Sequence, residues 1–254
     1  MPNWMLFMTL TEHCSVRFMN LKPSLTLMKG SSTGVPFQRA RSAEHQDMRR
    51  ATIVETCRTL LETTHPLDIR IRPLASLIGI APSGIYRYFE NIQSLLLHVH
   101  LCDVEEMVSG LEIDLMNGIN EPGAVAKALS THFLQEPRFL LLFSLTPVLY
   151  EREVSVETLT DHKLALLSHM ERAAIALMHT GLFRTPQDAT QAFGQMLAFA
   201  LGLYPLANPS DPAKSALKHP QLTFLDLDMA VELEEGLGIL LKGWHYEKML
   251  STGG

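Results

Sequence analysis

The chain has 254 residues, 46% of them hydrophobic, which is enough for one large or two modest domains whose cores need no metal or disulfide. Its formal net charge of −6 excludes an evenly basic nucleic-acid-binding protein, and three cysteines without CxxC spacing favour free thiols in the cytoplasm. No apolar run approaches membrane-spanning length and the first residues lack a secretory signal, so we expect a soluble protein with no membrane partner.

Residues 1–37 show no clean period and scatter Pro, Ser and Gly, so we predict either a poorly ordered extension or a start site upstream of the true one. From residue 38 to residue 100, eight basic residues face six acidic ones, whereas from residue 101 onward ten basic residues face twenty acidic ones. The sequence therefore predicts a mildly basic head on an acidic body, an asymmetry that would orient the head toward phosphate.

An all-α head is predicted over residues 38–90. Its first helix is expected at Ser42–Thr63, with Ser42 as the N-cap. Two shorter helices follow within IRPLASLIGIAPSGIYRY, joined at Gly79, because a tight turn between helices needs a residue that accepts positive φ. Pro82 suits the first turn of the second short helix, which we expect to reach about Phe89. The pattern is that of a helix-turn-helix unit.

The outward face of that second helix carries side chains that can hydrogen-bond to base edges or phosphates in a major groove. Arg87 is the strongest candidate, since arginine pairs with guanine through two hydrogen bonds. With neighbouring residues of the head added, the predicted DNA-binding residues are Arg49, Arg50, Arg70, Arg72, Ala81, Pro82, Ser83, Gly84, Tyr86, Arg87, Tyr88 and Asn91.

The stretch APSGIYRYFENIQSLLLHV resembles the tetracycline-repressor (TetR) family of transcriptional regulators, whose helix-turn-helix ends in a Tyr-Arg-aromatic-Phe block followed by a new helix. The resemblance in motif covers residues 49–99, and beyond them only the helix layout is similar. Arg70 stands where the family usually has a helix-capping Thr, and Ile92 where it usually has a phosphate-contacting Lys. The resemblance implies a homodimer that binds a palindromic operator on double-stranded DNA, usually as a repressor, and is released by a small-molecule effector.

Residues 91–254 show one helical pattern after another and predict an effector-binding and dimerisation domain. Near its start, His98 and Cys102 are four residues apart, with Glu105 or Glu106 one turn further on, so a metal-sensing regulator is an alternative reading. No other cofactor is predicted. Beyond the helix that opens at Asn91, we predict helices at 124–134, 155–180, 185–203 and 226–248, an apolar buried run at 139–143 and a loop at 204–223. Ser155 and Thr185 are expected to be the N-caps of the helices that begin there.

The body must also supply the effector and dimer sites. Aromatic, sulfur and histidine side chains there can line a mostly apolar pocket or simply form core. These effector candidates are Met107, His132, Phe133, Phe139, Phe143, Tyr150, His169, Met170, Met196, Phe199 and Tyr204. Two apolar helices near the C-terminus, with Gly194, Gly236 and Gly238 allowing close approach, predict a dimer interface at Ala192, Phe193, Met196, Ala200, Met229, Leu233, Leu237, Leu240 and Trp244.

Two other functional classes were weighed against the regulator. An enzyme is not predicted, because the sequence has no Gly-rich phosphate loop, GxSxG elbow or HExxH pair. A helical protein-interaction module without affinity for DNA is the other alternative. Such a module would not depend on Arg87 for binding and would show no salt-sensitive affinity for DNA. A regulator would depend on Arg87 and would bind DNA more weakly as the salt concentration rises.

Overall fold

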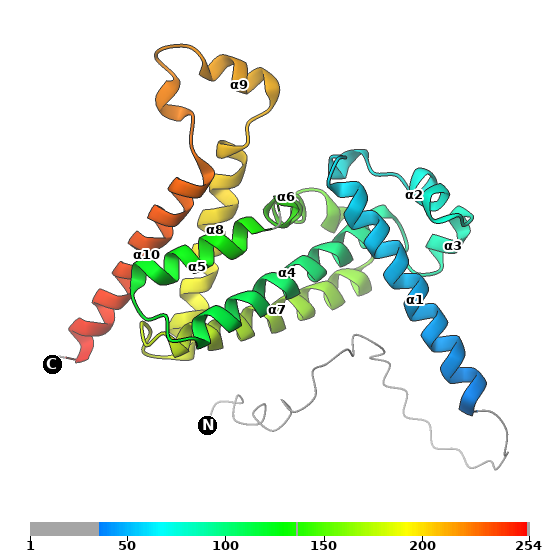
Figure 1. Ribbon diagram of the computed structural model, residues 1–254, viewed down its shortest axis with the longest axis horizontal. Helices are drawn as coiled ribbons and strands as arrows, with labels where there is room; N and C mark the ends of the chain where they lie inside the picture. The colour runs from blue at the N-terminus through cyan, green and yellow to red at the C-terminus, as the bar shows by residue number, and fades with distance from the viewer. Residues whose placement is uncertain (1–35, 136, 253–254) are drawn as a thin grey trace. The chain divides into compact units, whose positions relative to one another are not determined.

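The computed structural model describes residues 36–135 and 137–252, and within these ranges every regular element is a helix, which confirms the predicted all-α class (Figure 1). The predictions for residues 1–35 lie outside the described residues. None of the helices described is both long and apolar enough to cross a lipid bilayer. In chain order the elements are α1 (Pro36–Leu61), η2 (Pro66–Asp68), α2 (Ile71–Ile78), α3 (Pro82–Tyr86), α4 (Ile92–Met116), α5 (Pro122–Gln135), α6 (Pro137–Leu145), η3 (Tyr150–Arg152), α7 (Val156–His179), α8 (Pro186–Ala207), α9 (Asp211–Leu217), η4 (Thr223–Leu225) and α10 (Met229–Thr252).

From Ala43 onward the chain forms one compact unit, in which we call residues 43–90 the head and residues 91–252 the body. In the head, α2 and α3 are joined at Gly79 as predicted. Gly79 has a φ of +75°, and the N–H of Ile80 donates to the carbonyl of Ala75 at 3.0 Å. This left-handed residue and hydrogen bond cap the C-terminal end of α2. The left-handed glycine therefore sets the angle at which α3 leaves α2.

Helix ends in the head differ from the prediction in two places. The chain is already helical from Pro36, so Ser42 lies inside α1 and is not its N-cap. Helix α3 stops at Tyr86, three residues early, and the chain then turns so that the side chain of Phe89 enters the core. Arg70 is the N-cap of α2 and makes no side-chain cap bond, as its departure from the family pattern indicated.

The head packs around Ile53 and Cys57 of α1, Leu74 of α2 and Ile85 of α3, all of which are buried. Tyr150, a body residue, belongs to the same buried cluster. Because one apolar core crosses from head to body, a movement of either part must repack side chains of the other.

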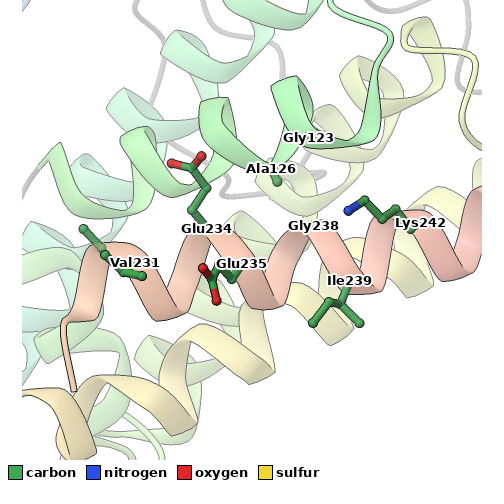
Figure 2. Close-up of a pocket in the computed structure, with 9 residues that line it drawn as sticks. Gly123, Ala126, Val231, Glu234, Glu235, Gly238, Ile239 and Lys242 are labelled. Carbon is green, nitrogen blue, oxygen red and sulfur yellow. The ribbon is translucent and has the colours of Figure 1, made fainter. Parts of the chain in front are cut away.

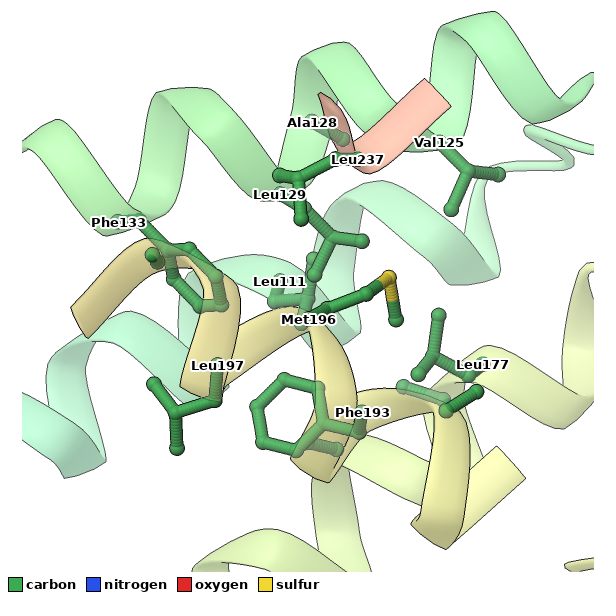
Figure 3. Packing of buried hydrophobic residues seen from close by; sticks show 14 of the residues in the cluster. Leu111, Val125, Ala128, Leu129, Phe133, Leu177, Phe193, Met196, Leu197 and Leu237 are labelled. Carbon is green, nitrogen blue, oxygen red and sulfur yellow. The ribbon is translucent and has the colours of Figure 1, made fainter. Parts of the chain in front are cut away.

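The body is built around α4, which packs along α5, α6 and α7, while α8 and α10 complete the bundle (Figure 1). Its core joins Leu111 of α4, Phe133 of α5, Leu177 of α7 and Phe193 and Met196 of α8 (Figure 3). These side chains come from four helices and interdigitate, so the bundle is held mainly by apolar burial.

Two predicted helix caps in the body are confirmed. The hydroxyl of Ser155 accepts the N–H of Thr158 at 3.1 Å at the start of α7, and Thr185 forms a reciprocal capping box with Asp188 at the start of α8. The predicted loop at 204–223 is wrong, because α8 continues through Pro205 to Ala207 and α9 follows within the same segment.

Candidate functional site

Helix α3 presents the side chains that we predicted to read DNA. Ser83 and Arg87 are exposed and Tyr86 is 54% exposed, whereas Ile85 is fully buried beneath them. The alternation follows from the helix period, since Ile85 faces α1 and α2 while its neighbours face outward. The face of α3 opposite Ile85 is therefore polar and open to solvent.

The remaining DNA-binding candidates lie in different surroundings. Arg49, Arg50, Arg72 and Ala81 are exposed, while Pro82, Gly84, Tyr88 and Asn91 are half-buried. The guanidinium of Arg50 lies over the ring of Phe89, 5.3 Å from its centroid. Its contact with Phe89 fixes Arg50 against the head, which restricts the positions from which it can meet a phosphate.

Two candidates also have structural roles within the chain. Arg70 donates from Nη1 to the carbonyls of Leu67 at 2.5 Å and Ile69 at 2.9 Å, which ties down the segment before α2. The Asn91 side chain accepts the N–H of Ser94 at 2.8 Å and donates from Nδ2 to the carbonyl of Glu153 at 2.5 Å. Asn91 thus caps α4 and links it to the segment before α7, so substituting it would change more than a DNA contact.

The His98 and Cys102 pair does not extend to a metal site within residues 36–135 and 137–252. Those ranges hold no group of three or more His, Cys, Asp or Glu side chains able to share an ion. The ring of His98 instead packs against Phe89 at 5.7 Å between centroids. Burial lowers the pKa of His98 to about 4 and raises the pKa of the Cys102 thiol, as expected for core-facing groups.

The predicted effector residues divide by burial. Most are buried, namely Met107, His132, Phe133, Phe139, Tyr150, His169 and Met196, whereas Phe143, Met170, Phe199 and Tyr204 are half-buried. Phe139 lies between Phe133 and Phe143, 6.0 Å from each between ring centroids, so α5 and α6 bring three candidates together. Tyr150 instead belongs to the core shared with the head.

Two histidine candidates of the body already have acidic neighbours. Nε2 of His132 lies 2.7 Å from Oδ2 of Asp114, and Nδ1 of His169 lies 3.1 Å from Oε2 of Glu105. Close packing holds His132 in place, since a Cβ at Gly110 would meet its ring at 2.6 Å. These contacts join α4 to α5 and to α7.

A buried imidazole pair that the effector prediction missed lies beside Phe143. Nδ1 of His100, on α4, is 3.2 Å from Nε2 of His162, on α7, and the His100 ring is 4.6 Å from Phe143 between centroids. Nε2 of His100 and Nδ1 of His162 have no hydrogen-bond partner within the described part of the chain. Burial, and then neighbouring positive charge, lowers the pKa of His100 to about 3 and that of His162 to about 4. Two neutral imidazoles leave one donor and one acceptor for a bound molecule.

A second buried polar group joins the head to the body. Oδ1 of Asp103, on α4, lies 3.2 Å from Nη2 of Arg58 on α1 and 2.9 Å from Nη2 of Arg138 on α6, while Oδ2 accepts from Nε of Arg138 at 3.0 Å. The Asp103 side chain has no exposed surface. Burial raises its pKa, and the two guanidiniums oppose that rise. Asp103 therefore holds helices of both parts through one carboxylate.

Asp103 was not among the residues predicted from the sequence, although its position carried one signal. It lies four residues before Met107 and seven after Leu96, on the apolar stripe of α4. A carboxylate on the buried face of a helix needs a positive partner elsewhere in the fold. The position could have been flagged, but its partners Arg58 and Arg138 could not have been named.

Six of the nine residues predicted at the dimer interface are covered by their own chain. Ala192, Phe193, Met196, Ala200, Leu233 and Leu237 are buried within a single chain, and Met229, Leu240 and Trp244 are half-buried against the same core. Of the three glycines, Gly236 does allow a close approach, but to Phe199 of the same chain, whose ring a Cβ would meet at 2.2 Å. The six buried residues therefore lie on the inner faces of α8 and α10, whereas Met229, Leu240 and Trp244 keep some surface that a second copy could cover.

Comparison with known proteins gives matches to one family and to solved structures. Residues 102–248 match the family described as tetracyclin repressor-like, C-terminal domain. The fatty acid degradation regulator FadR from Bacillus halodurans has a TM-score of 0.50 and 15% identity, covering 77% of this chain and 95% of that chain. The regulatory protein SCO4313 has a TM-score of 0.51 and 18% identity, and the match covers 82% of this chain and 100% of that chain. No curated protein matches the chain.

At these identities the two solved structures show a shared fold alone. The family match carries more, because it spans more than half of the chain, from the middle of α4 into α10. The head motif and the body therefore point independently to one family, whose members regulate transcription and are not enzymes. The chain belongs to the tetracycline-repressor-like family of DNA-binding, ligand-responsive transcriptional regulators.

Proposed function

We propose that this protein is a repressor that binds a palindromic operator as a homodimer and leaves it when a small, mostly apolar effector enters the body. Residues 38–90 would bind DNA, and residues 91–254 would bind the effector and the second copy. The observation that carries the proposal is the outward face of Ser83, Tyr86 and Arg87 on a helix whose direction is set by Gly79. That face has the size and polarity to enter a major groove.

The second copy would pack against the outer faces of α8 and α10. Ala198 and Gly202 of α8 are exposed and small, so they would let a partner helix approach closely. Val231, Ile239 and Tyr246 of α10 are all more than half exposed and recur at intervals of eight and seven residues, on one face of the helix. Dimerisation would bury this apolar face and pair two heads.

The effector would bind between α4, α6 and α7. The half-buried ring of Phe143 supplies apolar surface there, and the two unpaired ring nitrogens of His100 and His162 together supply one donor and one acceptor. A mostly apolar molecule with one hydrogen-bonding group fits this chemistry. Acyl compounds make a suitable first panel, because one structural neighbour is described as a regulator of fatty acid degradation.

Release would follow from a shift between two arrangements of the dimer. The operator would favour the arrangement that places the heads in successive major grooves, about 34–36 Å apart. An effector that binds better to a more widely separated pair of heads would lower the population able to bind DNA. Asp103 lies on the route between them, because it contacts α1 of the head and α6 of the body.

Selection from random DNA duplexes, followed by affinity measurements at several salt concentrations, tests this function. We expect a two-fold symmetric site whose log affinity falls steeply with log salt concentration, because phosphate contacts release counterions. Adding members of the acyl panel should then weaken binding to the selected site.

Two results would contradict the proposal in different ways. Enrichment of no sequence, with no salt-dependent affinity, would favour the protein-interaction module. Tighter operator binding in the presence of the effector would reverse the direction of regulation and indicate a co-repressor mechanism.

A further inference from the structure

The segment between α8 and α10, residues 208–228, forms an arm that packs against little of its own chain. Neither α9 nor η4 contributes a buried residue, and neither makes an extensive contact with another described element. Figure 1 shows the arm looping away from the ends of α8 and α10. Within the arm, η4 carries Phe224, which is 74% exposed, and Leu225, which is 45% exposed. Exposing two adjacent large apolar side chains to water is unfavourable, and a partner surface that covered them would lower the free energy.

The arm nevertheless has regular local structure. Lys214 donates its backbone N–H to the carbonyl of Ser210 at 2.8 Å, Leu222 to His219 at 2.8 Å and Leu225 to Leu222 at 2.9 Å. Consecutive turns therefore fix the backbone that presents Phe224. A preformed element loses less conformational entropy on binding than a flexible loop would.

A groove of about 550 Å³ lies along α10 where it crosses α5 (Figure 2). Small residues line it where the helices are closest, namely Gly123 and Ala126 of α5 and Gly238 of α10. Val231 and Ile239 add apolar surface, and both are more than half exposed. The groove therefore has room for a large side chain and apolar atoms to contact it.

Two lysines of the arm and two glutamates of the groove carry opposite charges, although the arm also carries Asp211, Asp226 and Asp228 and Lys242 also lines the groove. Glu234 and Glu235 line the groove, and both are exposed. Lys214 and Lys218 lie near the C-terminal end of α9, are exposed, and have no acidic side chain within 4.0 Å among the described residues. Approach of α9 to a groove would bring each lysine toward a carboxylate, which favours one docking orientation.

We propose that in the homodimer each arm crosses to the second copy and places Phe224 against Ile239 in that copy's groove, with Lys214 and Lys218 facing Glu234 and Glu235. This inference rests on the proposed homodimer. Ile239 also belongs to the exposed α10 face assigned to dimerisation, so the groove continues that interface. An arm that crosses in both directions is isologous, as two-fold symmetry requires.

Charge reversal with rescue tests the exchange in the full-length protein, with the dimer dissociation constant measured by sedimentation. The arm variant Lys214→Glu/Lys218→Glu and the groove variant Glu234→Lys/Glu235→Lys should each weaken the dimer by about tenfold. Combining all four substitutions should bring the constant back to within about threefold of the wild type. Additive weakening in the combined protein would overturn the proposed pairing.

Disulfide trapping gives a second measurement that does not depend on stability. In a background carrying Cys14→Ser and Cys102→Ser, Phe224→Cys with Ile239→Cys should yield a covalent dimer under mild oxidation. The matched control joins Phe224→Cys to Val156→Cys, an 81% exposed position on α7, and should remain uncrosslinked. A disulfide formed only within one chain would overturn the exchange.

The outcomes separate this inference from the proposed function. A wild-type dimer whose dissociation constant is unchanged by the arm and groove variants would remove the arm exchange and leave the homodimer in place. A wild-type chain that stays monomeric at every concentration would remove both.

Discussion

The head and the body place their polar side chains in opposite ways. In the head, Tyr86 at the end of α3 and Arg87 just after it are exposed, whereas Ile85 is buried. In the body, His100 and Asp103 are fully buried on α4. An exposed polar surface is solvated until a partner replaces the water, whereas a buried polar group must be satisfied inside the fold or cost stability. Substitutions in the two regions should therefore change different measurements.

The largest effect should come from breaking the buried ion pair of the body. Asp103→Ala leaves Arg138 and Arg58 without the carboxylate that they share, and losing one partner of a buried pair costs about 3–5 kcal/mol. Chemical denaturation should show that loss as a lower midpoint. The matched control is Asp103→Leu combined with Arg138→Met, which replaces both charges by apolar groups and should recover most of the stability. Equal losses in the two proteins would show that packing, and not the charge, dominates at this position.

A substitution on the exposed surface of the head should lower the affinity for DNA and leave the stability of the fold almost unchanged. Arg87→Ala removes an exposed side chain, so the free energy of unfolding should change by less than about 0.5 kcal/mol. Affinity for the selected operator should fall by about 1–3 kcal/mol if Arg87 contacts a base. The control is Arg184→Ala, another exposed arginine but one that lies between α7 and α8. An Arg87→Ala protein with normal operator affinity would remove this residue from the reading surface.

The buried imidazole of His100 should make the body sensitive to acid. Its pKa is lowered to about 3 from the ordinary 6.5, so below pH 6.5 the unfolded chain takes up a proton that the folded chain does not. Stability is therefore greatest above the unfolded pKa and falls as the pH drops. Between pH 7 and pH 5 the loss from this one group should be about 2 kcal/mol.

Denaturant midpoints at both pH values, compared with those of His100→Gln, isolate the contribution of this histidine. The variant should lose about 2 kcal/mol less on acidification, whatever its stability at pH 7. The same pH-dependent loss in both proteins would assign the acid sensitivity to other groups.

Local features of the fold could be predicted from the sequence, whereas contacts between residues far apart in the chain could not. Features set by nearby residues were predicted correctly, including the turn at Gly79 and the caps at Ser155 and Thr185, because glycine conformation and cap bonds are local. The pairs His100 with His162 and Asp103 with Arg138 are separated by 62 and 35 residues. Such contacts exist only once helices pack, so helical periodicity does not identify them.

Six of the nine residues predicted at the dimer interface are covered by their own chain, for a related reason. An apolar stripe shows which face of a helix avoids water but not which surface covers it, and the stripe with Phe193 and Leu237 is covered by the same chain. The exposed apolar positions Val231 and Ile239 fall outside that stripe and alternate with charged residues. Only burial in the folded chain distinguishes the two faces.

The smallest expected effect concerns the turn at Gly79, which sets the direction of α3. Gly79→Ala forces a side chain into a left-handed conformation, φ +75°, at a cost of about 1–2 kcal/mol. No atom lies within 4 Å of the added Cβ, so the whole cost should come from the backbone and none from a clash. Gly79→Asn is the matched control, because asparagine tolerates this region better and should lose less in thermal denaturation. If alanine and asparagine lost equally, a side-chain effect at the turn would be the cause. If alanine lost operator affinity beyond what its stability explains, the glycine would be shown to fix the direction of α3 and therefore to set where Arg87 meets DNA.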